Sequence, residues 1–213
     1  MKVDFFSIDE KKCNLLINAA KKNTDGNAKM NSVFITLTSL ALKRLHATKE
    51  SNQNIQIYES TINARQAFGL KDNVLGLNVV LLPDPFNLDE ISSENFWDVS
   101  TKRSIYLHTM VKNPQEMNKL YYDGLIAIAK QDHVNFCISN LGILENATGC
   151  IRVTKEYLVT NVPPSYAMYY SVVTINGKQF WTLTYYETNM STEIIEEFKR
   201  ELFNAIDEFI KDE

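Results

Sequence analysis

The sequence has few of the residues that build disordered, collagenous or disulfide-bonded proteins. Its 213 residues include 7 glycines, 5 prolines and 3 cysteines, whereas hydrophobic residues make up 45%. Such a chain can bury a substantial core, and its length suits a single domain over residues 1–213. The cysteines Cys13, Cys137 and Cys150 form no C-x-x-C pair. This is typical of a reducing compartment and predicts no metal site.

Positive charge and long apolar runs are also scarce. The net charge is -4, with lysines and arginines scattered among acids, so no nucleic-acid partner is expected. No run approaches the roughly 18–20 apolar residues of a membrane span. The N-terminal residues lack the apolar region and cleavage site of a signal peptide. We therefore expect a cytoplasmic protein with no membrane span.

Apolar residues at helical spacing predict five helices. The first is marked by a capping box, in which Ser7 and Glu10 satisfy each other's backbone amides. The fourth is marked by Asn113 as N-cap and Pro114 in the first helical position. The predicted helices cover residues 7–22, 30–45, 92–110, 114–130 and 194–209.

Runs of β-branched and aromatic residues predict the strands. They cover residues 54–65, 74–82, 134–140, 150–160, 165–174 and 179–186. The last two flank Asn176-Gly177, a pair that tolerates the positive φ angles of a tight hairpin turn. The fold class is therefore α/β (α+β layered), a mixed sheet packed by amphipathic helices. Contact with the sheet is expected through Leu37, Leu40, Ile194, Phe198 and Leu202.

Catalytic residues are not evident from the pattern. The strand spacing of His133 and Cys137 separates them by about 13 Å, too far for a nucleophile and its base. His46 ends a predicted helix and His108 lies within one, neither in a catalytic context. No Gly-rich phosphate-binding motif occurs. Residue types and spacing alone thus predict a folded α/β domain without an assigned reaction.

Four features together resemble a known superfamily. Asn63-Ala64-Arg65, Leu75-Gly76, Ser139-Asn140-Leu141-Gly142 and the ending of hairpin then helix are similar to the C-terminal lobe of condensation domains and alcohol acetyltransferases. This resemblance implies one lobe of a chloramphenicol acetyltransferase-like two-lobe fold. It implies that Ser139, Asn140 and Gly142 lie in the wall of a substrate tunnel, and that Asn63 and Arg65 are structural.

The superfamily's H-H-x-x-x-D-G motif is absent from this sequence. In that family its histidine is the general base that takes a proton from an alcohol or amine attacking a thioester. The resemblance therefore implies a lobe of an O- or N-acyltransferase with no catalytic residue of its own, expected to be inactive alone. Its partners would be an N-terminal lobe or a histidine-bearing chain, plus a small-molecule acyl donor and acceptor.

Two further expectations follow. No tightly bound cofactor or metal is predicted, and acyl-CoA or a pantetheine thioester would be the co-substrate. We also expect an apolar surface beside Asn140 and Gly142, including some of Tyr166, Met168, Tyr169, Tyr170, Phe180 and Trp181. The alternative function is a non-catalytic small-molecule-binding or protein-binding module that retains the fold.

Overall fold

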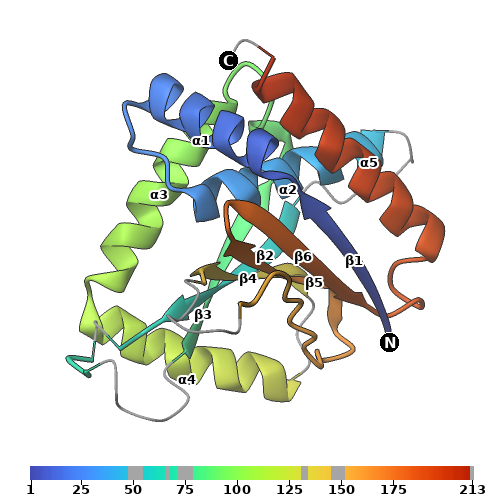
Figure 1. Ribbon diagram of the computed structural model, residues 1–213. Helices are drawn as coiled ribbons and strands as arrows, with labels where there is room; N and C mark the ends of the chain where they lie inside the picture. Colours follow the sequence, from blue (N-terminus) through green and yellow to red (C-terminus); the bar gives the residue numbers. More distant parts are fainter. Residues whose placement is uncertain (48–54, 66–67, 72–78, 131–133, 145–151, 212–213) are drawn as a thin grey trace.

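The structure, a computed structural model, describes residues 1–47, 55–65, 68–71, 79–130, 134–144 and 152–211. Helices and strands interleave until the chain closes with a hairpin and a long helix (Figure 1). The elements are β1 (Lys2–Ile8), α1 (Glu10–Thr24), α2 (Met30–Ala47), β2 (Ile55–Asn63), β3 (Val79–Asn87), the 3-10 helix η1 (Leu88–Glu90), α3 (Phe96–Val111), α4 (Pro114–Lys130), β4 (Val134–Ile143), β5 (Tyr166–Ile175), β6 (Lys178–Tyr185) and α5 (Thr192–Phe209).

The strands form one six-stranded sheet in the order β1-β6-β5-β4-β2-β3. The central strands β5, β4 and β2 run parallel, with Phe136 of β4 level with Met168 on one side and Tyr58 on the other. The remaining pairs are antiparallel. The predicted α/β fold with a mixed sheet is therefore confirmed.

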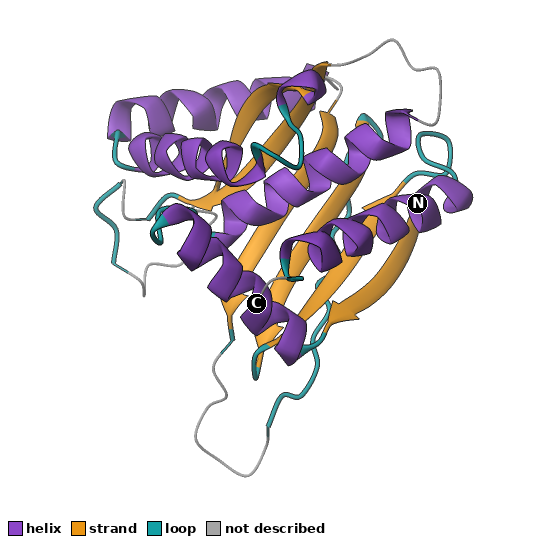
Figure 2. Ribbon diagram, turned by 90° about the horizontal axis from the view of Figure 1, so that it is seen from above, coloured by secondary structure: helices purple, strands orange, loops and turns teal. Residues whose placement is uncertain are grey.

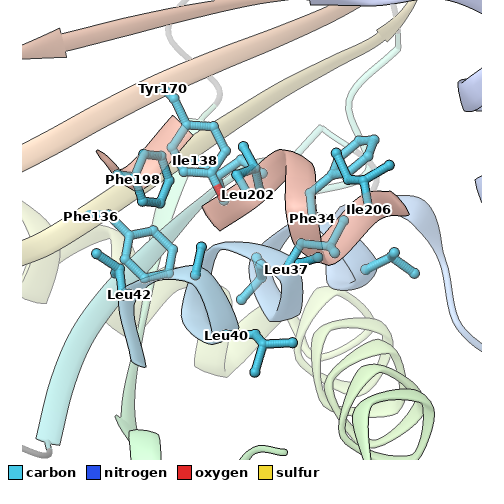
Figure 3. Close-up of a cluster of buried hydrophobic side chains, with 14 of the residues drawn as sticks. Phe34, Leu37, Leu40, Leu42, Phe136, Ile138, Tyr170, Phe198, Leu202 and Ile206 are labelled. Carbon is cyan, nitrogen blue, oxygen red and sulfur yellow. The ribbon is translucent and has the colours of Figure 1, made fainter. Parts of the chain in front are cut away.

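The main core lies between one face of the sheet and the helices that cover it (Figure 2). Alternate residues of β4, Phe136 and Ile138, point into this core. They meet Leu37 of α2 and Phe198 and Leu202 of α5 (Figure 3). The predicted packing residues Leu37, Leu40, Phe198 and Leu202 are buried here, and Ile194 packs against them. None of the described helices combines the length and the apolar character needed to cross a membrane.

The predicted β5–β6 hairpin is confirmed. Its two-residue turn is Asn176-Gly177, with φ angles of 50° and 75°. Both values lie in the left-handed region, which two-residue hairpin turns of this kind require. The β-carbon of any residue replacing Gly177 would lie 2.7 Å from Cγ of Glu10. The turn therefore packs against the first turn of α1.

The beginning of the chain differs from the prediction. Ser7 is not a helix cap but part of β1, where it lies opposite Phe180 of β6. The N-cap of α1 is Asp9, whose Oδ1 accepts a hydrogen bond of 2.9 Å from the amide of Lys12. Pairing with β6 buries Phe6 and Ile8 against the core. The capping-box interpretation was wrong because that burial outweighs a local cap.

The predicted strand over residues 150–160 is also wrong. Residues 150 and 151 lie outside the described residues, and residues 152–160 form no strand. The strands β4 and β5, which precede and follow this segment, already have partners on both sides. The segment instead crosses the face of the sheet opposite the main core. The Ser171 hydroxyl donates to the Leu158 carbonyl at 2.8 Å, and the Tyr157 ring packs on Phe180 at 5.5 Å between centroids.

The edge strand β3 continues further than predicted. It runs through Pro83 and Pro85 to Asn87 and pairs with β2 alone. Proline lacks the amide hydrogen that a central strand needs, but an edge strand tolerates it. Residues 74–78 of the predicted strand, with Leu75 and Gly76, lie outside the described residues.

Candidate functional site

A cavity of about 370 Å³ opens where the carboxyl ends of β2 and β4 meet the beginning of α2 and the last turns of α3. We call it the α2 cavity. Its volume is within the range of small-molecule sites. Its lining combines polar, basic and apolar side chains: Lys29, Asn31, Ser32, Thr61, Ile62, Asn63, Ser104, Leu107, His108, Val111, Asn140 and Gly142.

The position of this cavity follows from the topology. β2 and β4 are adjacent parallel strands, so their carboxyl ends lie at the same edge of the sheet. Ligands of α/β proteins bind preferentially in crevices outside the carboxyl ends of parallel strands. The cavity therefore lies where the fold itself leaves room for a ligand.

The beginning of α2 has an unusual cap. The amide of Val33 donates to the Lys29 carbonyl at 3.1 Å, which makes Lys29 the N-cap. Lysine has no oxygen with which to accept the free amides of the first turn. The Lys29 amide itself donates to the Ser104 hydroxyl of α3 at 2.8 Å. The start of α2 is thus tied to α3 through the backbone of Lys29.

Two polar atoms beside this cap are buried without a hydrogen-bond partner. They are Oγ of Ser32 and Oδ1 of Asn31, and both residues line the α2 cavity. Ser32 is only 1% exposed. An unpaired buried polar atom costs free energy that a ligand can recover.

The predicted tunnel-wall residues are only partly brought together. Asn140 and Gly142 both line the α2 cavity, and Oδ1 of Asn140 accepts from the Gly142 amide at 2.9 Å. Gly142 has a φ of 78°, a conformation that favours glycine. Ser139 is buried but is not part of the cavity lining.

The residues predicted to be structural lie at the end of β2. Oδ1 of Asn63 accepts from the Arg65 amide at 3.1 Å and from its guanidinium at 3.5 Å. This is a local turn in which the side chain of Asn63 replaces a backbone acceptor. Asn63 also lines the α2 cavity, a placement that the sequence did not indicate.

A second polar cluster lies on the opposite face of the sheet. The hydroxyl of Tyr166 donates to Oε2 of Glu59 at 2.5 Å, and both residues are buried. Burial raises the pKa of Glu59, while the hydrogen bond from Tyr166 lowers it. Burial also raises the pKa of the Cys137 thiol strongly, which disfavours the thiolate form that a nucleophile needs.

Large apolar side chains follow Asn140 directly. Leu141 is 47% exposed, Ile143 75% and Leu144 37%. In contrast, Tyr166, Met168, Tyr170, Phe180 and Trp181 are buried and Tyr169 is partly buried. The prediction that these residues contribute to an exposed apolar face was therefore wrong, whereas the apolar surface beside Asn140 comes from leucine and isoleucine.

Among the described side chains, His108 is the one histidine. It lines the α2 cavity from α3. His133 and the side chain of His46 lie outside the described residues, as does Cys150. Within the described part of the chain, no group of three or more His, Cys, Asp and Glu could hold a metal ion.

Sequence reasoning did not connect Lys29, Asn31, Ser32 and His108. The pattern predicts the helix at residues 30–45 but no site at its beginning. A signal was present, because a helix that begins Lys29-Met30 after a Gly-containing break lacks an oxygen-bearing cap. The position of His108 near the beginning of α2 could not be predicted, because it depends on how α3 packs against α2.

The fold is similar to about half of several solved condensation-type domains and acyltransferases. The epimerization domain from the third module of tyrocidine synthetase B superposes with a TM-score of 0.70 at 12% identity, over 99% of this chain and 48% of that one. The trichothecene 15-O-acetyltransferase from Fusarium sporotrichioides superposes with a TM-score of 0.73 at 12% identity, over 98% of this chain and 47% of that one. The wax ester synthase/diacylglycerol acyltransferase from Marinobacter aquaeolei VT8 superposes with a TM-score of 0.57 at 10% identity, over 99% of this chain and 49% of that one.

The chain thus spans about half the length of these solved structures. At such low identity the likeness defines the fold. No protein-family model matches the sequence, and a search of curated proteins finds no significant match.

Proposed function

We propose that this chain is the C-terminal lobe of a thioester-dependent O- or N-acyltransferase. In this proposal it contributes the wall of a substrate tunnel, and an N-terminal lobe or a separate histidine-bearing chain supplies the general base. Acyl-CoA or a carrier-bound pantetheine thioester is the acyl donor. The observation that carries the proposal is the extent of the match, since acyltransferase structures cover 98–99% of this chain with 47–49% of their own length.

Two features of the site support the proposal. Asn140 and Gly142 line a cavity of suitable size for a small substrate. The exposed Leu141, Ile143 and Leu144 follow immediately, and apolar surface of this kind suits contact with another lobe.

The first test is an activity assay. The purified chain, incubated with acetyl-coenzyme A and a panel of alcohols and amines, should give no turnover above background, because the general base is missing. The control is a variant with His46, His108 and His133 all replaced by Ala. Acetyl transfer that persists in this variant would contradict both the inactivity and the histidine mechanism.

The second test is binding of the acyl donor's thioester arm. S-acetylpantetheine should shift the backbone amide resonances of Asn140 and Gly142, and Asn140→Ala should weaken binding about tenfold, the effect of one lost hydrogen bond. Asn204→Ala, at an exposed position on α5, is the matched control and should bind as the parent chain does. Equal binding by both variants would remove Asn140 from the tunnel wall.

A non-catalytic small-molecule-binding module is the second candidate. It is favoured by the α2 cavity, because residues of this chain line it without a contribution from a second lobe. A ligand that binds the α2 cavity tightly without any thioester would support this alternative. Restored acetyl transfer upon addition of a histidine-bearing lobe would exclude it.

A further inference from the structure

Two residues that line the α2 cavity carry buried polar atoms that no group in the described part of the chain satisfies. Oγ of Ser32 has no hydrogen-bond partner although the residue is 1% exposed, and Oδ1 of Asn31 is also buried without a partner. Native proteins pair nearly all such atoms. The Ser32 hydroxyl therefore has a proton that it can donate to a ligand.

The backbone beside Ser32 is suited to an anion. Met30, Asn31 and Ser32 form the first turn of an 18-residue helix, and the amides of this turn have no intrahelical acceptor. The N-cap, Lys29, supplies no side-chain oxygen. Free amides and the positive end of the helix dipole together favour a negatively charged group.

The charged side chain beside the cavity is positive. Lys29 and the imidazole of His108 line it, whereas no Asp or Glu is among the described lining residues. The ammonium of Lys29 gives one hydrogen bond to the Gly26 carbonyl at 3.1 Å and has two further hydrogens to donate. Asn140 also lines the cavity and uses its Oδ1 for the Gly142 amide, so its NH₂ group remains as a donor.

Part of the lining is apolar. Ile62, Leu107 and Val111 also line the cavity. A bare inorganic ion would leave this apolar surface without contact, whereas an organic ester would cover it.

We propose that the α2 cavity binds the phosphate group of a small phosphate monoester. The amides of the first turn of α2, the Ser32 hydroxyl and the Lys29 ammonium hold the phosphate oxygens. The organic part lies against Ile62, Leu107 and Val111. A phosphate fits better than a carboxylate. A phosphate monoester offers three oxygens in a tetrahedral arrangement to these donors, whereas a carboxylate offers two oxygens in one plane. This proposal does not depend on the acyltransferase proposal.

The test is a titration followed by backbone amide resonances, with n-butyl phosphate as the probe. Saturable shifts are expected for Met30, Asn31, Ser32, His108 and Asn140. Inorganic phosphate should bind the same residues more weakly, because it lacks the apolar contact. Butyrate carries the same hydrocarbon on a carboxylate, and equal affinity for butyrate would overturn the assignment to phosphate.

Ser32→Ala should weaken butyl phosphate binding about tenfold or more, since it removes a hydrogen bond to a charged group. The matched control is Ser39→Ala in the same helix. Ser39 is equally buried, but its hydroxyl donates to the Ile35 carbonyl at 2.9 Å, and this variant should bind normally. Equal weakening in both variants would show a general effect on α2 and would contradict the proposal.

Stability separates a binding role from a structural one. Ser32→Ala removes an unpaired hydroxyl, so its melting temperature should not fall, whereas Ser39→Ala should lower it.

Lys29→Gln should weaken binding of butyl phosphate, and Lys21→Gln, at an exposed position near the end of α1, should not. The proposal would be overturned if the amide resonances that shift were spread over surface lysines, or if the shifts did not saturate as butyl phosphate is added. S-acetylpantetheine has no phosphate. Failure of S-acetylpantetheine to bind would therefore count against the acyltransferase proposal alone, and failure of butyl phosphate to bind would count against the phosphate proposal alone.

Discussion

At the scale of single residues, Glu59 is a carboxyl group placed where water cannot reach it. It is 3% exposed in the central strand β2 and accepts its hydrogen bond from Tyr166. Cys137 of the neighbouring strand lies level with it. Desolvation is the largest cause of its raised pKa, because the charged form loses its hydration while gaining a single hydroxyl donor.

This environment predicts how stability depends on pH. The folded chain holds the Glu59 proton to higher pH than the unfolded chain, whose glutamate titrates near 4.5. The contribution of Glu59 to the free energy of unfolding is therefore greatest below pH 4.5 and is lost as the pH rises through the raised folded pKa. Glu59→Gln should flatten this decline, measured by urea unfolding at a series of pH values.

The exposed Glu90 of η1 provides the control for that measurement. Glu90→Gln should leave the pH dependence as it is in the parent chain. A decline of the same slope in Glu59→Gln would mean that another group carries the pH dependence.

At the scale of elements, the β5–β6 hairpin depends on a backbone conformation that glycine adopts without strain. Gly177 has a φ of 75° and lies against Glu10 at the beginning of α1. The same turn sets the register of β6, and β6 in turn pairs with β1. One residue thus links the hairpin, the edge strand β1 and the first helix.

Gly177→Ala should therefore destabilise the fold by about 1–2 kcal/mol from backbone strain alone, with a further cost from the contact with Glu10. Thermal unfolding measures the total. Gly69→Ala isolates the backbone part, because Gly69 has a φ of 65° and no atom within 4 Å of its added β-carbon. Equal losses in the two variants would mean that the Glu10 side chain moves aside at no cost.

At the scale of the whole molecule, the contact between α2, α5 and the sheet contributes most of the core. Phe34 and Leu37 of α2 meet Leu202 and Ile206 of α5 over the central strands (Figure 3). This packing holds α2 in place, and with it the beginning of α2 that lines the cavity. Stability and the geometry of the site therefore depend on the same helix.

Leu202→Ala should cost about 2–5 kcal/mol, because it leaves a cavity in a fully buried part of the core. Leu141→Ala is the matched control at an exposed position and should change the free energy of unfolding by less than about 0.5 kcal/mol. Chemical denaturation of both variants measures the difference. A large loss in Leu141→Ala would show that this end of β4 is already covered within the chain.

The sequence by itself determined those elements whose signals are local. Asn113 accepts hydrogen bonds from the amides of Gln115 and Glu116 at the predicted start of α4, and Asn176-Gly177 forms the predicted turn. The amphipathic stripes of α2 and α5 pack as their spacing predicted. Local caps, turns and periodicities act within a few residues, so one sequence window contains the information.

The tertiary structure decided what depends on pairing between distant segments. Ser7 lies in a strand because β6, more than 170 residues away, is its neighbour. Residues 152–160 form no strand and lie beside β5 and β6, which already have partners on both sides. The α2 cavity also depends on contacts between distant segments of the chain. Lys29, Ser32, His108 and Asn140 belong to three elements and a loop that meet only when the helices pack on the sheet, so no local pattern could place them together.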